Sequence, residues 1–485
     1  MENQIYYLSQ NLALLLIIVI SSIFILIGIL YSKKHQNLSN YLTAGRNVRS
    51  LSLTTSLVAS ALGAWILFGP ASAATWGGVG SVIGYALGAA FPMLIFIFLG
   101  TRIRKVFPRG NTLTEFVHKK FGKNLFNLVL ILTIFYMFIF LCAEVTAVSM
   151  LINYISGTPL WLTAILIIVT TLAYTLYGGL RASIFTDNIQ FFIILILLFI
   201  SVYYLFSLNL NHISFEVVKN NSGHLLSGKY IPNYTAGLTF FIAVAATNLF
   251  HQGNWQRIFA AKNNKILKKS LLLSFFIIIP IVFFMGISGI IAVSIDSKVN
   301  PDLAFFSVLL KDNLKFLSIA IIILAITLTV STVDTLINAI SSIIIVDGKK
   351  IFKRSIKSNF LNLSKVFIVI LSIISLVIAS KGYSILYLFL LADLLCCAAV
   401  FTVFYGFYQR KFMEKTSIIS ILIGLFLGLL LFPSPDFSKS ILVGTVFSFD
   451  LFPNIVSSSL LFWSFLLATV GPAIVIISYD SFKRR

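Results

Sequence analysis

The chain has 485 residues, of which 59% are hydrophobic and 11% are charged, whereas a soluble domain carries roughly 25% charged residues. So few charges cannot cover the surface of a soluble fold of this size, and the composition therefore excludes one. The net charge of +21 does not indicate a nucleic-acid partner, because the Lys and Arg residues lie almost wholly in short segments between apolar runs.

Apolar runs of about 16 to 30 residues recur along the chain, close to the roughly 20 residues that cross a bilayer as a helix. In lipid the backbone must satisfy its own hydrogen bonds, and these runs lack the alternation of barrel strands, so we predict an all-α integral membrane protein. We expect about thirteen transmembrane helices, at residues 12–31, 52–76, 79–99, 125–152, 160–177, 186–206, 236–255, 271–295, 316–346, 363–380, 385–408, 417–432 and 458–478.

The distribution of basic residues predicts the orientation, because segments on the cytoplasmic side are enriched in Lys and Arg. With the N-terminus outside, 29 of the 36 basic residues lie in inside segments. The largest inside clusters are residues 102–123, 257–269 and 349–365. We therefore expect a multi-pass protein of the inner (plasma) membrane with an outside N-terminus and a cytoplasmic C-terminus.

The second predicted span contains Gly63 and Pro70, which both weaken helical hydrogen bonding. A break there frees backbone carbonyls that can point at an ion, and transporters place such broken helices near the middle of the bilayer. A simple proline kink is the alternative interpretation.

Four acidic residues lie inside predicted spans, where a charged group costs roughly 2.5–3.5 kcal/mol, and each is a candidate functional residue. They are Glu144, Asp187, Asp334 and Asp393. The alternatives are structural: a backbone or basic partner for Glu144, and a helix cap for Asp393.

Polar residues also interrupt the seventh span, between Asn248 and Arg257. The second and seventh spans are five apart, so five spans counted from each have opposite orientations, which is the arrangement of an inverted repeat. We expect one transmembrane domain over residues 1–485, in which 12–31 is an extra N-terminal helix, 52–206 and 236–408 are the two repeats, and 417–478 holds two extra helices.

The ninth span carries a polar stripe at steps of three and four residues, which is one face of a helix. Its members are Ser331, Asp334, Thr335, Asn338, Ser341 and Ser342. Such a face avoids lipid, and it either joins helices by hydrogen bonds or supplies oxygens to a hard cation such as Na+.

Four segments together resemble the sodium:solute symporter family, which includes sodium/proline, sodium/galactose and sialic acid carriers. They are residues 41–46 (YLTAGR), 59–65, 174–190 and 331–338. The resemblance in layout covers nearly the whole chain. It implies a leucine-transporter-type fold with two inverted five-helix repeats, and sodium-coupled uptake of a small polar organic solute by alternating access.

The resemblance also implies a sodium site between the second and ninth spans. Its ligands would be the carbonyls of Ala59, Leu62 and Leu328 and the hydroxyls of Ser331 and Thr332. A second cation or coupling site would use Asp187, which is a sodium ligand in some members, together with Asp334 and Thr335. In one departure, Ala61 stands where proline carriers have an aspartate, so proline chemistry does not carry over to that position.

The solute pocket is expected among the second, third, fourth, seventh and eleventh spans. Candidate residues are Tyr85, Glu144, Asn248, His251, Gln252 and Asp393. The Asn and Gln residues suit a neutral hydrogen-bonding solute, such as urea, an amino acid or a sugar. Two alternatives stay open: a proton-coupled carrier that protonates Asp334 or Asp187, and a non-transporting, sensor-like membrane protein. No paired catalytic motif indicates an enzyme, and a monomer is the working assumption.

Overall fold

The computed structural model describes residues 6–33, 37–212, 215–351, 360–408, 414–437, 439–440, 442–443 and 458–484. Within these residues the chain folds into helices joined by short segments, with two isolated β-bridges. The helices are α1 (Gln10–Ser32), α2 (Leu38–Thr43), η1 (Ala44–Arg46), α3 (Ser50–Ala61), η2 (Ala64–Leu67), α4 (Gly69–Val106), α5 (Leu113–Phe121), α6 (Lys123–Ser156), α7 (Leu160–His212), α8 (Phe215–Leu226), α9 (Ile231–Phe250), α10 (Gln252–Ala260), α11 (Asn264–Ile295), η3 (Pro301–Leu303), α12 (Ala304–Leu309), α13 (Lys315–Ile351), α14 (Phe360–Ala379), α15 (Ile385–Gly406), α16 (Glu414–Leu431) and α19 (Leu460–Arg484).

Two long helices each contain a glycine with a non-helical backbone at the boundary between two predicted spans. Gly78 in α4 has φ +58° and Gly179 in α7 has φ +60°. Only glycine adopts this backbone conformation without strain. Space is also short there, since a Cβ at Gly78 would lie 2.3 Å from the carbonyl oxygen of Leu225. Ten of the described helices are long and apolar enough to cross a membrane, so the protein is a multi-pass membrane protein. Every predicted span overlaps one or more of the described helices, while the count of thirteen crossings stays a prediction.

The second predicted span is interrupted at the position that sequence reasoning indicates. Helix α3 ends at Ala61, Leu62 has φ −97° and ψ 88°, and Gly63 is extended at φ −88° and ψ −175°. Pro70 lies in the first turn of α4, where its missing N–H costs nothing. The interruption is therefore a break at Leu62 and Gly63, and it is not a proline kink.

The seventh predicted span is interrupted as well. Helix α9 ends at Phe250, His251 has φ −60° and ψ 107°, and α10 starts at Gln252. The end of α10 is held against the segment before α3, because the N–H of Val48 donates to the carbonyl of Ala260 at 3.1 Å.

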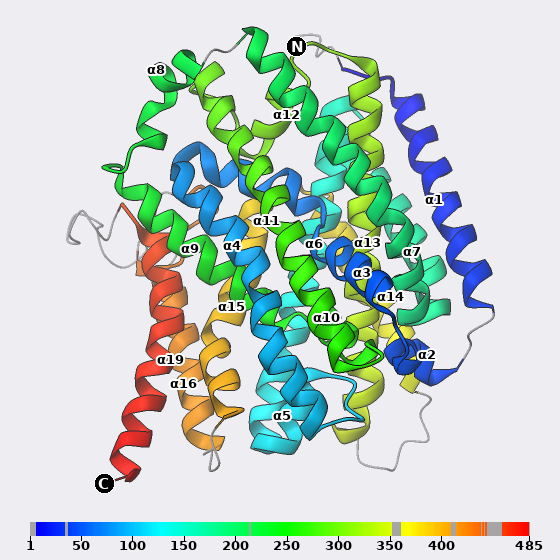
Figure 1. Ribbon diagram of the computed structural model, residues 1–485, viewed down its shortest axis with the longest axis vertical. Helices are drawn as coiled ribbons and strands as arrows, with labels where there is room; N and C mark the ends of the chain where they lie inside the picture. Colours follow the sequence, from blue (N-terminus) through cyan, green and yellow to red (C-terminus); the bar gives the residue numbers. More distant parts are fainter. Residues whose placement is uncertain are drawn as a thin grey trace.

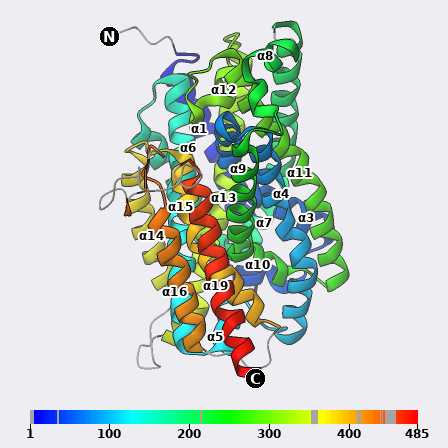
Figure 2. The same cartoon turned by 90° about the vertical axis from the view of Figure 1, so that its left-hand side faces the viewer.

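The helices surround α13, which is buried along most of its length. Helix α13 packs against α3, η2, α6 and α7. Helix α1 lies along one side of the bundle beside α7, and α16 and α19 lie together along the opposite side (Figure 1). Helix α19 ends at the far end of the long axis from the start of α1 (Figure 2). Helix α3 is exposed at Leu51 and buried from Leu53 to Ser60, so the break lies inside the bundle.

Several basic residues used to predict the orientation lie outside the described residues. They are Lys34, Lys353, Arg354, Lys357, Arg410, Lys411 and Arg485.

Candidate cation and solute sites

The break after α3 leaves two backbone carbonyls without a partner. The N–H of Leu62 donates to Val58 at 2.9 Å and that of Ile66 donates to Gly63 at 3.2 Å. Among the described residues, no backbone or side-chain donor reaches the carbonyls of Ala59 or Leu62. Because buried carbonyls normally have partners, these two oxygens are available to a ligand.

An unpaired hydroxyl and an unpaired carboxylate oxygen meet at the same break. A Cβ at Gly63 would lie 2.8 Å from Thr332 Oγ1 and 2.2 Å from Glu144 Oε1. Both atoms are buried, and neither has a hydrogen-bond partner within the described chain. The other oxygen of Glu144 accepts the N–H of Ala64 at 2.8 Å. Carbonyl, hydroxyl and carboxylate oxygens are the donors that hard cations prefer, so these groups fit Na+.

The remaining sodium-site candidates lie on α13. Leu328 and Ser331 are both buried, and they are three residues apart, which places them on one face of the helix. The hydroxyl of Ser331 donates to Asp187 Oδ1 at 2.7 Å. Ser331 therefore contacts the acid of the second predicted cation site.

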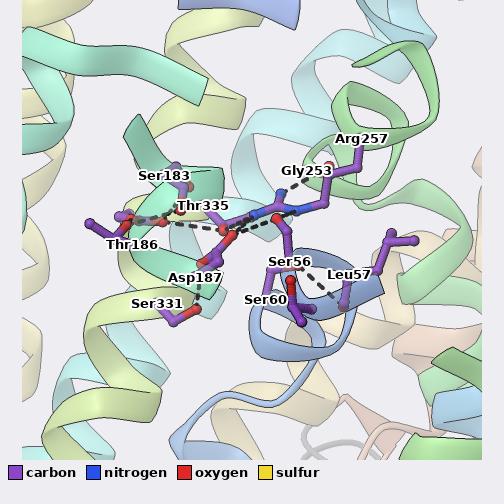
Figure 3. A network of polar contacts seen from close by, with 12 residues as sticks. Ser56, Leu57, Ser60, Ser183, Thr186, Asp187, Gly253, Arg257, Ser331 and Thr335 are labelled. Carbon is purple, nitrogen blue, oxygen red and sulfur yellow. Dashed lines mark hydrogen bonds and ion pairs between the residues drawn. The ribbon is translucent and has the colours of Figure 1, made fainter. Parts of the chain in front are cut away.

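The acid Asp187 is paired with an arginine (Figure 3). Arg257 Nη2 lies 2.7 Å from Asp187 Oδ2, and both side chains are fully buried. Ser56 Oγ also donates to Asp187 Oδ2 at 2.6 Å and accepts from Arg257 Nε at 2.7 Å. Charge-assisted bonds of this length are strong. The position beside Asp187 is thus filled by a guanidinium.

The burial of Arg257 corrects the sequence-based expectation, which assigns this residue to an inside cluster of basic residues. Helix α10 turns back at His251 and carries Arg257 into the interior, where it also donates to the carbonyl of Gly253 at 3.1 Å. A usable signal was present in the sequence, since acids inside a membrane protein require a buried partner and Arg257 borders the interrupted seventh span.

The acid Asp334 belongs to the same network. Its carboxylate accepts from Tyr174 at 2.7 Å and Ser183 at 2.8 Å. Thr335 Oγ1 lies 3.3 Å from Asp334 Oδ1 and accepts from Arg257 Nη2 at 2.9 Å. Asp334 is therefore linked to Arg257 through Thr335, whereas Asp187 contacts the guanidinium directly.

A central pocket lies beside the break, and four of the six predicted solute residues line it. They are Tyr85, Asn248, His251 and Asp393. Glu144 caps the segment after the break. Gln252 accepts the N–H of Leu113 at 3.0 Å and donates to the carbonyl of Asn111 at 3.1 Å. Neither of these two lines the pocket.

Aromatic walls of the pocket were missed by sequence reasoning. Trp65, Phe140 and Phe389 line it together with Tyr85. The sequence contains 46 Phe and 18 Tyr residues, mostly in apolar runs, so nothing marks these few as lining residues. Three residues of the break segment, Ser60, Ala61 and Trp65, also line the pocket. The helix break therefore contributes both to the candidate cation site and to the pocket.

The sequence profile of the sodium:solute symporter family matches residues 41–424. The chain belongs to this family. This symporter is 28% identical over 410 residues to the spermidine transporter DUR31 of Candida albicans, with 82% of this chain and 77% of the relative covered. It is 26% identical over 453 residues to the sodium/myo-inositol cotransporter 2 of Bos taurus, with 82% and 66% covered.

A solved structure gives the same result for the fold. A Na+-coupled sialic acid symporter in a substrate-bound outward-open state matches with a TM-score of 0.71 and 16% identity over 96% of both chains. The predicted resemblance and the leucine-transporter-type fold are therefore confirmed. The protein is a sodium-coupled secondary transporter and not an enzyme, and Na+ is its coupling ion.

Proposed function

We propose that one Na+ binds where the broken α3 meets α13 and drives uptake of a small polar solute bound in the central pocket. The observation that carries this proposal is the unpaired Thr332 hydroxyl beside the free oxygen of Glu144, at a break whose carbonyls are also free. The proposed ligands are Ala59, Leu62, Leu328, Ser331 and Thr332, and Glu144 supplies negative charge nearby.

The proposed coupling rests on the shared segment 59–65. A cation that binds the Ala59 and Leu62 carbonyls orders this segment against α13. The same segment presents Ser60, Ala61 and Trp65 to the pocket, so sodium binding increases the affinity for the solute. Because coupling between two binding sites is reciprocal, bound solute increases the affinity for sodium by the same factor. The membrane potential contributes about 2.3 kcal/mol per charge per 100 mV to inward movement of the ion.

We assign Asp187, Asp334 and Thr335 to coupling and not to a second sodium. The guanidinium of Arg257 already supplies a positive charge to Asp187 at 2.7 Å. A Na+ at the same position would have to displace a buried arginine that donates four hydrogen bonds, which is strongly unfavourable. The proposed stoichiometry is therefore one Na+ for each solute.

We propose that the protein lies in the inner (plasma) membrane. Its N-terminus is then outside the cell and its C-terminus is in the cytoplasm. We also propose that residues 52–206 and 236–408 are the inverted repeats. The matching interruptions at Leu62–Gly63 and at His251 support this division. A monomer contains all the residues that the proposal uses.

Counterflow in proteoliposomes tests the proposed function. Purified full-length protein is assayed with urea, an amino acid, a sugar, sialic acid and an amine, with and without Na+. Accumulation of at least one solute only in the presence of Na+ supports the proposal. Sodium-independent counterflow of every transported solute contradicts it.

A further inference from the structure

The central pocket holds a carboxylate without a positive partner. Asp393 lines the pocket and accepts only the hydroxyl of Thr247, at 2.6 Å, among the hydrogen bonds of the described residues. The nearby His251 accepts the N–H of Gly253 at its Nδ1, so that nitrogen carries no proton and the ring is not an imidazolium. No Lys or Arg is among the described residues that line this pocket.

The remaining walls suit a positive charge. Trp65 and Tyr85 stack at 5.7 Å between ring centroids, and Phe140 and Phe389 meet edge to face at 4.7 Å. Aromatic faces attract ammonium and guanidinium groups, most strongly when water is excluded. The free volume is small, about 30 Å³, so this state leaves room for a compact group only.

A second cavity of about 410 Å³ repeats this chemistry at the end of the bundle where α9 and α15 begin. In the proposed orientation this end faces the outside. Asp302 lines the cavity together with Trp76 and Tyr230, and again no Lys or Arg is found among the described lining residues. An acid in a partly enclosed cavity raises the local concentration of cations.

Four aromatic rings in contact lie between the two cavities. Trp76 of the outer cavity lies 5.8 Å from Phe240, and Phe240 stacks on Tyr85 of the central pocket at 4.7 Å. Tyr85 in turn stacks on Trp65 at the helix break. The two acid-containing cavities are therefore separated by aromatic side chains and not by charged ones.

We propose that the transported solute is a compact organic cation, an ammonium or amidinium compound, which binds at Asp302 in the outer cavity and then at Asp393 in the central pocket. This rests on the proposed function, because the pocket is taken as the solute site of a sodium-coupled carrier. It departs from the neutral solute that the Asn and Gln side chains indicate in the sequence.

Pairs of solutes with the same shape and different charge test this proposal. Purified protein in proteoliposomes is exposed to guanidinium or urea, acetamidinium or acetamide, and putrescine or 1,4-butanediol, while solute-induced currents are recorded with and without Na+. We expect at least one cation to give a sodium-dependent current at a tenfold or more lower concentration than its neutral counterpart. Currents confined to neutral solutes, or no current with any cation, overturn the proposal.

Two variants locate the charge selectivity. Asp393→Asn should remove the preference of at least tenfold for the cation, and Asp302→Asn should raise the half-saturating concentration of the cation several-fold without changing that of the neutral partner. The matched controls are Asp480→Asn, a partly buried acid on α19 that accepts from Tyr405, and the exposed Asp296→Asn. Unchanged selectivity in Asp393→Asn contradicts the assignment.

Charge movement on addition of Na+ alone separates the two proposals and reports that each variant is folded. Sodium-induced charge movement together with responses to neutral solutes only would overturn the cationic solute and leave the proposed function standing. Loss of all sodium responses in the unmodified protein would overturn the proposed function itself.

Discussion

Arg257 Nη2 and Asp187 Oδ2 lie 2.7 Å apart, with both side chains fully buried. The pair joins α10 to α7, and Ser331 of α13 donates to the other oxygen of the same carboxylate. Removing one partner of a buried ion pair leaves an uncompensated charge, which is far more costly than removing both.

The first prediction concerns this pair. Asp187→Asn or Arg257→Gln alone should each destabilise the protein by about 3–5 kcal/mol. The double variant should recover part of that loss, with a coupling energy of about 2 kcal/mol. The measurement is a double-mutant cycle on the free energy of unfolding in detergent. Additive losses would show that the pair contributes no interaction energy.

The second prediction concerns the space at the helix break. Gly63→Ala should abolish sodium-dependent uptake, because its Cβ would lie 2.2 Å from Glu144 Oε1 and 2.8 Å from Thr332 Oγ1. The backbone of Gly63 at φ −88° accepts any residue, so the effect comes from the methyl group alone. Uptake is measured at matched amounts of protein in the membrane.

A glycine in open surroundings provides the control. The ideal Cβ at Gly223 in α8 meets only the side chain of Lys219, at 4.0 Å, so Gly223→Ala should leave uptake unchanged. Normal sodium dependence in Gly63→Ala would mean that the space at the break is not used by an ion.

The third prediction concerns orientation. In a background with the three buried cysteines replaced, Lys298→Cys should react with a membrane-impermeant maleimide added to intact cells, and Lys262→Cys should not. Both positions are exposed, and in the proposed topology they lie on opposite sides of the membrane. Labelling in the reverse order would invert the topology.

Much of the fold could be predicted because membrane helices follow from local composition. The break at Gly63 was also visible, since glycine and proline both weaken a helix inside an apolar run. The pairing of Asp187 with Arg257 could not be read in the same way. Basic residues near span ends normally lie at the membrane surface, and only the turn at His251 carries this one into the interior.

The solute pocket was the least predictable part. Asp393 and His251 stood out because polar groups are rare in spans, but the aromatic walls did not, since Trp65 and Phe389 are ordinary residues of apolar helices. Their role depends on which faces of α4, α6, α9 and α15 meet, and this is decided by packing between segments distant in the sequence.

The fourth prediction tests the central claim that a sodium ion is held between the broken α3 and α13. Thr332→Val removes one proposed oxygen ligand at nearly constant volume. The loss of sodium-binding free energy should be about 1.5–3 kcal/mol, the range for hydrogen bonds to charged groups, so the half-saturating sodium concentration should rise about 10- to 150-fold. Ser331→Ala combined with this change should raise it further.

The same helix offers a matched control. Thr329 is also buried with an unpaired hydroxyl among the described residues, but it is not one of the proposed ligands, so Thr329→Val should leave the sodium dependence unchanged. The most direct measurement is binding of radioactive Na+ to the purified protein and to these two variants. We predict one ion per chain, with affinity lowered strongly by Thr332→Val and unaffected by Thr329→Val. Equal affinities in all three proteins would contradict a sodium site at this break.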